Sequence, residues 1–126
     1  MIRLAAVALT LVALAVPAVE AAEVAGSWET SQGLMRITPR ADGSYDLWFE
    51  LFPGKATGTL DGNVMTGTWY RLNGAAPCPE PRDDKVYWGT FSIAFEAEGK
   101  FQGGWSFCDY HLYQVEPTGF KGTRTD

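Results

Sequence analysis

From residue 24 onward, apolar and polar positions alternate in short runs that turn-forming residues separate. Glycine-containing turn signals recur at Asp42-Gly43, Pro53-Gly54, Asp61-Gly62-Asn63, Asn73-Gly74 and Glu98-Gly99. Period-two alternation between such turns favours short antiparallel strands joined by hairpins. No window carries apolar residues at helical spacing over three turns, so we expect no long helix. The pattern predicts eight strands, at 24–30, 34–40, 45–52, 56–60, 64–72, 86–96, 101–108 and 120–125, with 112–115 as a candidate ninth.

Five of these segments share a glycine at the same place in the alternation. The motif is a large or apolar residue, glycine and a second large residue, in Val24-x-Gly26-x-Trp28, Ala56-x-Gly58-x-Leu60, Met65-x-Gly67-x-Trp69, Phe101-x-Gly103-x-Trp105 and Phe120-x-Gly122-x-Arg124. Period two places the three residues on one face. Glycine inside a strand costs stability, so its repetition needs a structural reason. We expect a narrow barrel in which rings from neighbouring strands lie over the glycine backbone.

The same alternation predicts which side chains face the interior of the barrel. They are Trp28, Met35, Ile37, Tyr45, Leu47, Phe49, Leu60, Met65, Trp69, Phe91, Ile93, Phe95, Phe101, Trp105, Phe107 and Phe120. Arg124 is the one charged residue that we place inward. There it caps an open end of the barrel, paired with a carboxylate or stacked on a ring, or it binds a carboxylate at the mouth of a cavity.

The outward positions carry three large aromatic residues, Trp48, Phe52 and Trp88. An outward tryptophan most often lies lightly buried or covers the edge of a sheet. The alternative is that the three form an apolar surface patch, which would indicate a partner or an oligomer face.

The first 21 residues have the pattern of a secretory signal. A basic start at Met1-Ile2-Arg3 precedes an apolar run over 4–16, then Pro17 and small residues at Val19 and Ala21. The run is shorter than the ~20 residues that a membrane-spanning helix requires. We therefore expect cleavage near Ala21, export to the periplasm or beyond, and a single β-barrel domain over 22–126.

Charge and cysteine content narrow the function further. The net charge of −5 disfavours nucleic acids and anionic membrane surfaces, because both bind basic patches. The only two cysteines, Cys78 and Cys108, are expected to form a disulfide in an oxidising compartment. The proline-rich stretch 75–85 around Cys78 predicts an extended surface loop that the disulfide holds at one end.

The sequence shows no recognisable catalytic set. His111 is the single histidine, with Asp109 nearby, and no Gly-x-Ser-x-Gly motif is present. Glu80 and the Asp83-Asp84 pair add only a weak metal-binding hypothesis, because structural zinc sites use four ligands in which Cys or His predominates. We predict no catalytic residue, no metal and no cofactor.

Part of the chain resembles the avidin and streptavidin family. The segments Gly26-Ser27-Trp28, Gly33-Leu34-Met35-Arg36-Ile37 and Asp42-Gly43 are similar to the opening hairpin of that family, and 89–95, 101–103 and 120–124 to its later strands. The resemblance implies a barrel of about eight strands. It does not imply biotin binding, because Thr30 and Leu34 stand where the ligand-bonding Asn and Ser should fall, and Phe120 replaces a Trp.

A second resemblance is to a group of uncharacterised bacterial exported domains. It rests on Tyr87-Trp88-Gly89, Trp105-Ser106-Phe107-Cys108-Asp109 and the closing Gly122-Thr123-Arg124, and spans roughly 26–124. The resemblance implies a barrel joined by a Cys78–Cys108 disulfide. It implies no activity.

The predicted fold is a small all-β, antiparallel, eight-stranded barrel, an avidin-like or lipocalin-like meander with one disulfide. Barrels of this size either fill with side chains or hold one small ligand. We expect non-enzymatic binding of a small apolar or aromatic ligand that enters at the loop end, in a cavity lined by Trp28, Trp69 and Trp105, with Arg124 as a further candidate.

Two other functions remain open at this point. One is an exported protein-binding domain or hydrolase inhibitor that acts through the Cys78 loop and the face carrying Trp48 and Trp88. The other is a barrel enzyme whose catalytic set the sequence does not reveal.

Overall fold

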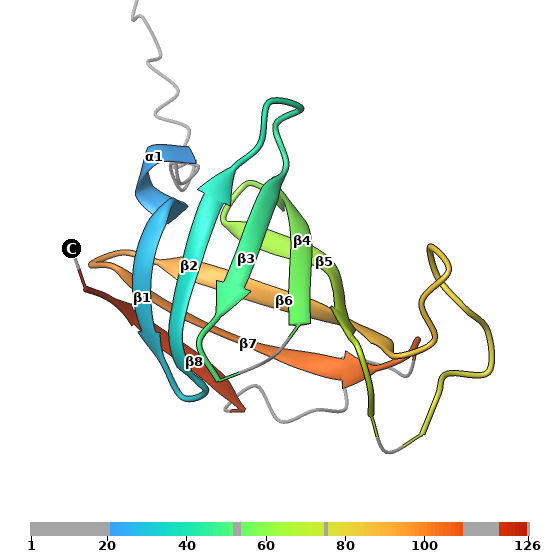
Figure 1. The fold of residues 1–126 in the computed structure, drawn as a ribbon. Helices are drawn as coiled ribbons and strands as arrows, with labels where there is room; N and C mark the ends of the chain where they lie inside the picture. The colour runs from blue at the N-terminus through green and yellow to red at the C-terminus, as the bar shows by residue number, and fades with distance from the viewer. Residues whose placement is uncertain (1–20, 52–53, 75, 110–118, 126) are drawn as a thin grey trace, which may run out of the picture.

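The structure is a closed antiparallel barrel in which each strand pairs with its neighbours in sequence and β8 returns to pair with β1 (Figure 1). This computed structural model describes residues 21–51, 54–74, 76–109 and 119–125. One helical turn, α1 (Ala21–Val24), precedes the barrel. The strands are β1 (Gly26–Thr30), β2 (Gly33–Pro39), β3 (Tyr45–Phe49), β4 (Gly54–Asp61), β5 (Val64–Arg71), β6 (Trp88–Glu96), β7 (Lys100–Phe107) and β8 (Phe120–Arg124).

The eight-stranded antiparallel barrel predicted from the sequence is confirmed, and individual strand bounds shift by a few residues. The largest difference is at β3, which ends at Phe49 rather than at 52. β6 begins at Trp88 rather than at 86, because the Val86 carbonyl accepts a hydrogen bond from the Cys78 N–H (2.7 Å) within the preceding loop. The candidate ninth strand at 112–115 and residues 1–20 of the predicted signal lie outside the described residues. Among the residues described, no helix has the length and hydropathy that crossing a bilayer requires.

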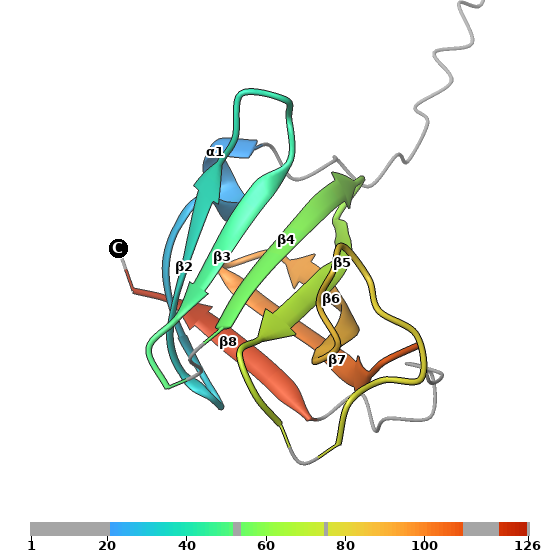
Figure 2. The ribbon, with the colours of Figure 1, turned by 45° about the vertical axis from the view of Figure 1, so that its right-hand side comes forward.

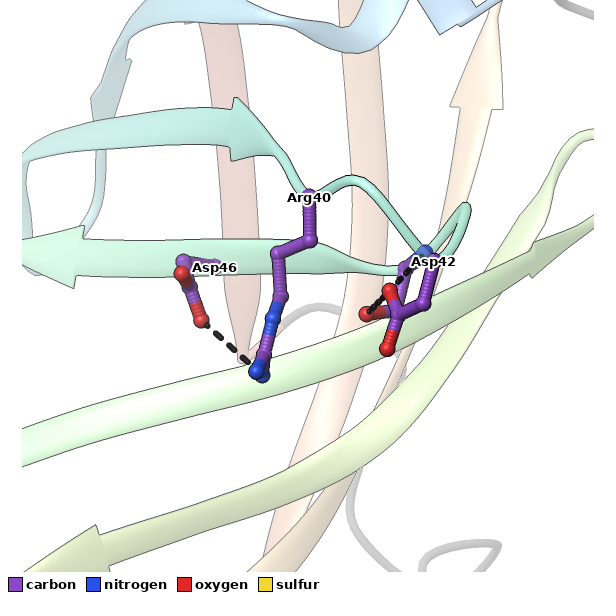
Figure 3. A network of polar contacts seen from close by, with 4 residues as sticks. Arg40, Asp42 and Asp46 are labelled. Atoms are coloured by element: carbon purple, nitrogen blue, oxygen red, sulfur yellow. Dashed lines mark hydrogen bonds and ion pairs between the residues drawn. The ribbon is translucent and has the colours of Figure 1, made fainter.

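Side-chain hydrogen bonds to the backbone shape the turn between β2 and β3. Asp42 Oδ1 accepts hydrogen bonds from the Ser44 hydroxyl (2.5 Å) and the Ser44 N–H (2.9 Å), and Arg40 pairs with Asp46 across the hairpin at 3.5 Å (Figure 3). These bonds favour the charged carboxylate and so lower the pKa of Asp42, the Ser44 hydroxyl being the main cause. Gly43 follows at a φ of 88°, which favours glycine.

Rings of one strand lie over glycines of the next at Gly122, a glycine of the repeated motif, and at Gly89, which lies outside it. Phe101 is the direct cross-strand partner of Gly122, and Trp69 is the partner of Gly89. A Cβ atom at Gly122 would lie 2.1 Å from Phe101 Cε2, and one at Gly89 would lie 2.2 Å from Trp69 Cε2. Both separations are too short for any non-bonded pair of carbon atoms. Glycine is therefore required at both positions for the ring to lie flat against the barrel wall.

The predicted core is confirmed at most positions. Buried are Trp28, Met35, Ile37, Tyr45, Leu47, Met65, Trp69, Phe91, Ile93, Phe95, Phe101 and Phe120, together with Val24 and Ala56, which were not predicted. Phe49, Leu60 and Trp105 are half-buried against this core. Phe107 faces a cavity of the barrel, but its predicted burial in the core was wrong. This side chain is 53% exposed, because Phe107 is the last residue of β7 and lies where the barrel opens.

One end of the barrel is closed by α1 and Arg124, and we call it the closed end. Trp28 is 1% exposed, donates a hydrogen bond from Nε1 to the Val24 carbonyl (3.0 Å) and packs against Phe95 and Phe101. The Arg124 guanidinium donates hydrogen bonds to the carbonyls of Glu23 and Ala25, and its Cζ lies 5.3 Å from the centre of the Trp28 ring. Arg124 therefore caps this end by stacking on a ring, one of the two roles expected for it.

The contact between Gly122 and Phe101 leads to a stability prediction. Gly122→Ala should lower the free energy of unfolding by about 2 kcal/mol or more, because the added methyl overlaps a ring that Trp28, Phe95 and Phe120 hold in place. Urea denaturation measures the loss. The control is Thr123→Ala, the exposed neighbour on β8, which should cost less than about 1 kcal/mol. Equal effects of the two substitutions would contradict the role given to the glycine.

Candidate functional site

The end of the barrel opposite α1 contains a cavity of about 220 Å³, and we call it the open end. It lies among the turn between β1 and β2, the last residues of β3, β5 and β7, and the start of β8 (Figure 1). Most of the lining is apolar. Its six aromatic members are Phe49, Trp69, Phe91, Trp105, Phe107 and Phe120.

Trp69 leaves the centre of this end open because its ring is tied to the wall. Trp69 Nε1 donates a hydrogen bond to the Ser106 carbonyl (3.0 Å) on β7, and the ring lies over the Gly89 backbone on β6. Trp105 and Phe107 pack edge to face on Trp69, with ring centres 6.3 Å and 5.6 Å away. The three rings form a continuous aromatic wall in the favoured T-shaped geometry.

The rest of the described lining is also largely apolar. Phe49 and Phe120 meet edge to face at 6.3 Å, and Ala56 on β4, beside Trp69, contributes only a methyl group. Ala56 is the direct cross-strand partner of both Leu47 and Trp69. A small residue between two large ones keeps free volume at this level of the barrel.

The structure places the four predicted ligand-binding residues at two different ends. Trp69 and Trp105 line the cavity. Trp28 and Arg124 do not line it, because they pack under α1 at the closed end. Their inward orientation was predicted correctly, but the structure places them away from this cavity. Alternation specifies the face of a strand on which a side chain lies, and says nothing of depth along the barrel axis.

Arg71 is the charged residue of the described lining, and it was not predicted there. It extends the inward series of β5 from Met65, Gly67 and Trp69 to the last residue of the strand, and it lines the cavity together with Gln32. The same alternation that placed Arg124 inward could have found it. Arg71 is half-buried, and its backbone N–H donates a hydrogen bond to the Tyr87 carbonyl (2.8 Å).

The loop between β5 and β6 folds against the outside of the barrel (Figure 2). The predicted disulfide is present and joins Cys78 of this loop to Cys108, directly after β7. Trp88 lies beneath this loop at 5% exposure. Its Nε1 donates a hydrogen bond to the Glu80 carbonyl (2.9 Å), and the Arg82 guanidinium lies 4.1 Å from the centre of its ring.

The predicted surface patch of Trp48, Phe52 and Trp88 is therefore wrong for Trp88, which the loop buries. Trp48 is 48% exposed on β3, and its cross-strand partner Arg36 lies over the ring at 5.4 Å. Phe52 lies outside the described residues.

The tip of the loop is joined to the barrel wall by a hydrogen bond. Tyr70 Oη donates to Asp83 Oδ2 at 2.9 Å, and Lys85 Nζ lies 5.7 Å from the Tyr70 ring. Burial and then the adjacent Asp83 carboxylate raise the pKa of Tyr70, because both disfavour the phenolate. Asp83 and Asp84 both have positive φ angles, 51° and 63°, in the tight turn that Arg82 and Lys85 close.

No group of three histidine, cysteine or carboxylate side chains gathers for metal binding anywhere in the described ranges. His111 lies outside them, while Asp109 is exposed directly after the disulfide.

No known protein family, curated protein or solved structure matches this chain. The fold and the site therefore define its class by themselves. The protein is a closed eight-stranded antiparallel barrel with a disulfide-bonded outer loop and an aromatic-lined cavity at one end.

The disulfide leads to a second prediction. Replacing both cysteines by alanine should lower the free energy of unfolding by about 3–4 kcal/mol, because the bond closes a loop with a sequence separation of 30 residues in the unfolded chain. Denaturation of oxidised protein and of the double variant measures the difference. A loss below about 1 kcal/mol would show that the noncovalent contacts of Trp88 hold the loop without the bond.

The raised pKa of Tyr70 leads to a third prediction. Protonated Tyr70 stabilises the folded state at pH values below its unfolded pKa of about 10, and this contribution is lost as the pH rises through the folded pKa. Asp83→Asn should move the Tyr70 titration back toward 10. Phenolate absorbance measures the titration, and Tyr70→Phe identifies the signal that belongs to Tyr70. Asp84→Asn, at the adjacent residue, is the matched control. An unchanged titration in Asp83→Asn would contradict the part of the shift assigned to the Asp83 carboxylate.

Proposed function

We propose that this protein is an exported, non-enzymatic binding module that holds a small apolar or aromatic ligand in the open-end cavity. The observation that carries the proposal is the aromatic lining of that cavity in a barrel whose opposite end is filled. A concave, mostly apolar space with a few polar groups at its margin is the common form of a small-molecule site.

The volume limits the size of the ligand. About 220 Å³ exceeds the roughly 150 Å³ of an apolar cavity that holds benzene, and lies below the ~300 Å³ at which pockets for drug-sized molecules begin. A molecule of one or two fused rings fits this range. With so few atoms in contact, we expect dissociation constants of roughly micromolar to submillimolar size.

The chemistry of the lining favours binding over catalysis. The described lining consists of rings and aliphatic groups, with one guanidinium and one carboxamide. A guanidinium stays protonated and a carboxamide is not basic, so neither serves as a nucleophile or general base at neutral pH.

The export part of the proposal is supported by two features. One is the signal-like pattern of the first 21 residues, and the other is the Cys78–Cys108 disulfide, a bond that persists mainly in oxidising compartments.

The protein-binding alternative has less support. Of the aromatic face assigned to it, Trp88 is buried. Trp48, which is 48% exposed with Arg36 over its ring, and the tip of the Cys78 loop remain as its surface.

A titration with one- and two-ring probes tests the proposal. Benzene, indole and naphthalene should bind saturably beside Trp69 and Trp105, as calorimetry measures, and should raise the melting temperature. Ala56→Leu fills part of the cavity and should weaken naphthalene binding at least about tenfold.

The matched control is Thr57→Leu, the next residue of β4, which lies on the other face of the strand. Saturable binding that Ala56→Leu leaves unchanged would place the ligand elsewhere. No saturable binding of any probe would refute the proposal.

A further inference from the structure

Arg71 introduces a positive charge at the edge of an apolar cavity. It is the last residue of β5, one step of the inward series beyond Trp69, so its side chain extends from the aromatic wall toward the open end. Its direct cross-strand partner on β4 is Gly54. The backbone bond to Tyr87 keeps the end of the strand in place.

The surroundings of Arg71 strengthen its effect on an anion. The cavity wall includes the rings of Trp69, Trp105 and Phe107, which are less polar than water and so lower the local dielectric constant. Charge–charge and charge-assisted hydrogen bonds are stronger in such an environment than in bulk water. The position at the rim also lets a bound anion keep part of its hydration, which limits the cost of desolvation.

The shape of the guanidinium selects the kind of anion. Its planar donors match the two oxygens of a carboxylate in a bidentate pair. Gln32, on the turn between β1 and β2, lines the same cavity and can donate from its amide. Arg71 is the one cationic side chain of the described lining, which suits a singly charged carboxylate better than a doubly charged phosphate.

We infer that the ligands of the open-end cavity are small aromatic carboxylic acids, with one or two rings inside the barrel and the carboxylate on Arg71. This inference rests on the proposed function and names its ligand class. A molecule of this kind uses both the aromatic interior and the charged rim.

Pairs of equal shape and different charge test the inference. Phenylacetate is compared with phenylacetamide, and indole-3-acetate with indole-3-acetamide, by calorimetry on the whole protein at neutral pH and low salt. Tryptophan fluorescence adds a second measurement for the phenyl pair. Each acid should bind about tenfold or more tightly than its amide, the size expected when a charge-assisted hydrogen bond is lost. Added salt should weaken the acid and leave the amide unchanged.

Substitution then assigns the effect to Arg71. Arg71→Gln should abolish the preference for each acid over its amide, so that the two bind with equal affinity, and Arg71→Lys should retain part of the preference. Arg36→Gln, which removes a cation from the outer face over Trp48, is the matched control and should change neither.

A readout without mutation covers the case in which Arg71→Gln fails to fold. In the unaltered protein, acid affinity should fall as the pH drops through the pKa of the ligand carboxyl, while the affinity of the amide stays constant. A flat profile for the acid overturns the inference.

The remaining outcomes separate this inference from the proposed function. Equal affinity of acids and amides, with naphthalene also bound, overturns the carboxylate and leaves an apolar binding site. Failure of acids, amides and naphthalene alike overturns both. A preference for acids that survives in Arg71→Gln overturns the assignment to Arg71.

Discussion

The contact between an aromatic ring and a glycine on the adjacent strand is the interaction on which this barrel depends. Neighbouring strands lie only about 4.8 Å apart, so a large ring that lies flat on the wall must cover backbone that carries no side chain. Phe101 over Gly122 and Trp69 over Gly89 meet this condition, and in both pairs a Cβ would overlap the ring. Glycine weakens each strand on its own, and ring burial offsets that cost once the sheet closes.

Aromatic rings pack differently at the two ends of the barrel. At the closed end, Trp28 packs edge to face with Phe95 and tilts against Phe101, and α1 with Arg124 covers the rings. At the open end, the hydrogen bond from Trp69 to the Ser106 carbonyl holds its ring against the wall. The small side chain of Ala56 beside it leaves space that no ring fills. One end is therefore filled with side chains, and the other contains a cavity.

The outer loop supports the open end from outside the barrel. Cys108 directly follows Phe107, and its backbone N–H donates to the Trp88 carbonyl at 2.8 Å. This hydrogen bond joins the end of β7 to β6, and the disulfide joins it to the outer loop. Trp88, Cys78 and Cys108 form a second small core with Tyr70 packed against it. The bond thereby fixes the strand end that carries Trp105 and Phe107 into the cavity rim. The outer loop and the cavity lining are therefore connected through this segment.

The sequence by itself determined the number and order of the strands, the inward face of each and the pairing of the two cysteines. Those properties follow from period-two alternation, turn residues and cysteine count, which are local or compositional signals. The sequence did not determine how far along the barrel axis each inward side chain lies. Trp28 and Trp105 have the same inward signature, yet one is sealed under α1 and the other lines a cavity.

Only the tertiary structure decided which end is open, that a loop covers Trp88, and that Arg71 rather than Arg124 meets the cavity. The stagger of strands in a closed barrel and the path of long loops are set by contacts between distant segments. Alternation along one strand carries no information about them.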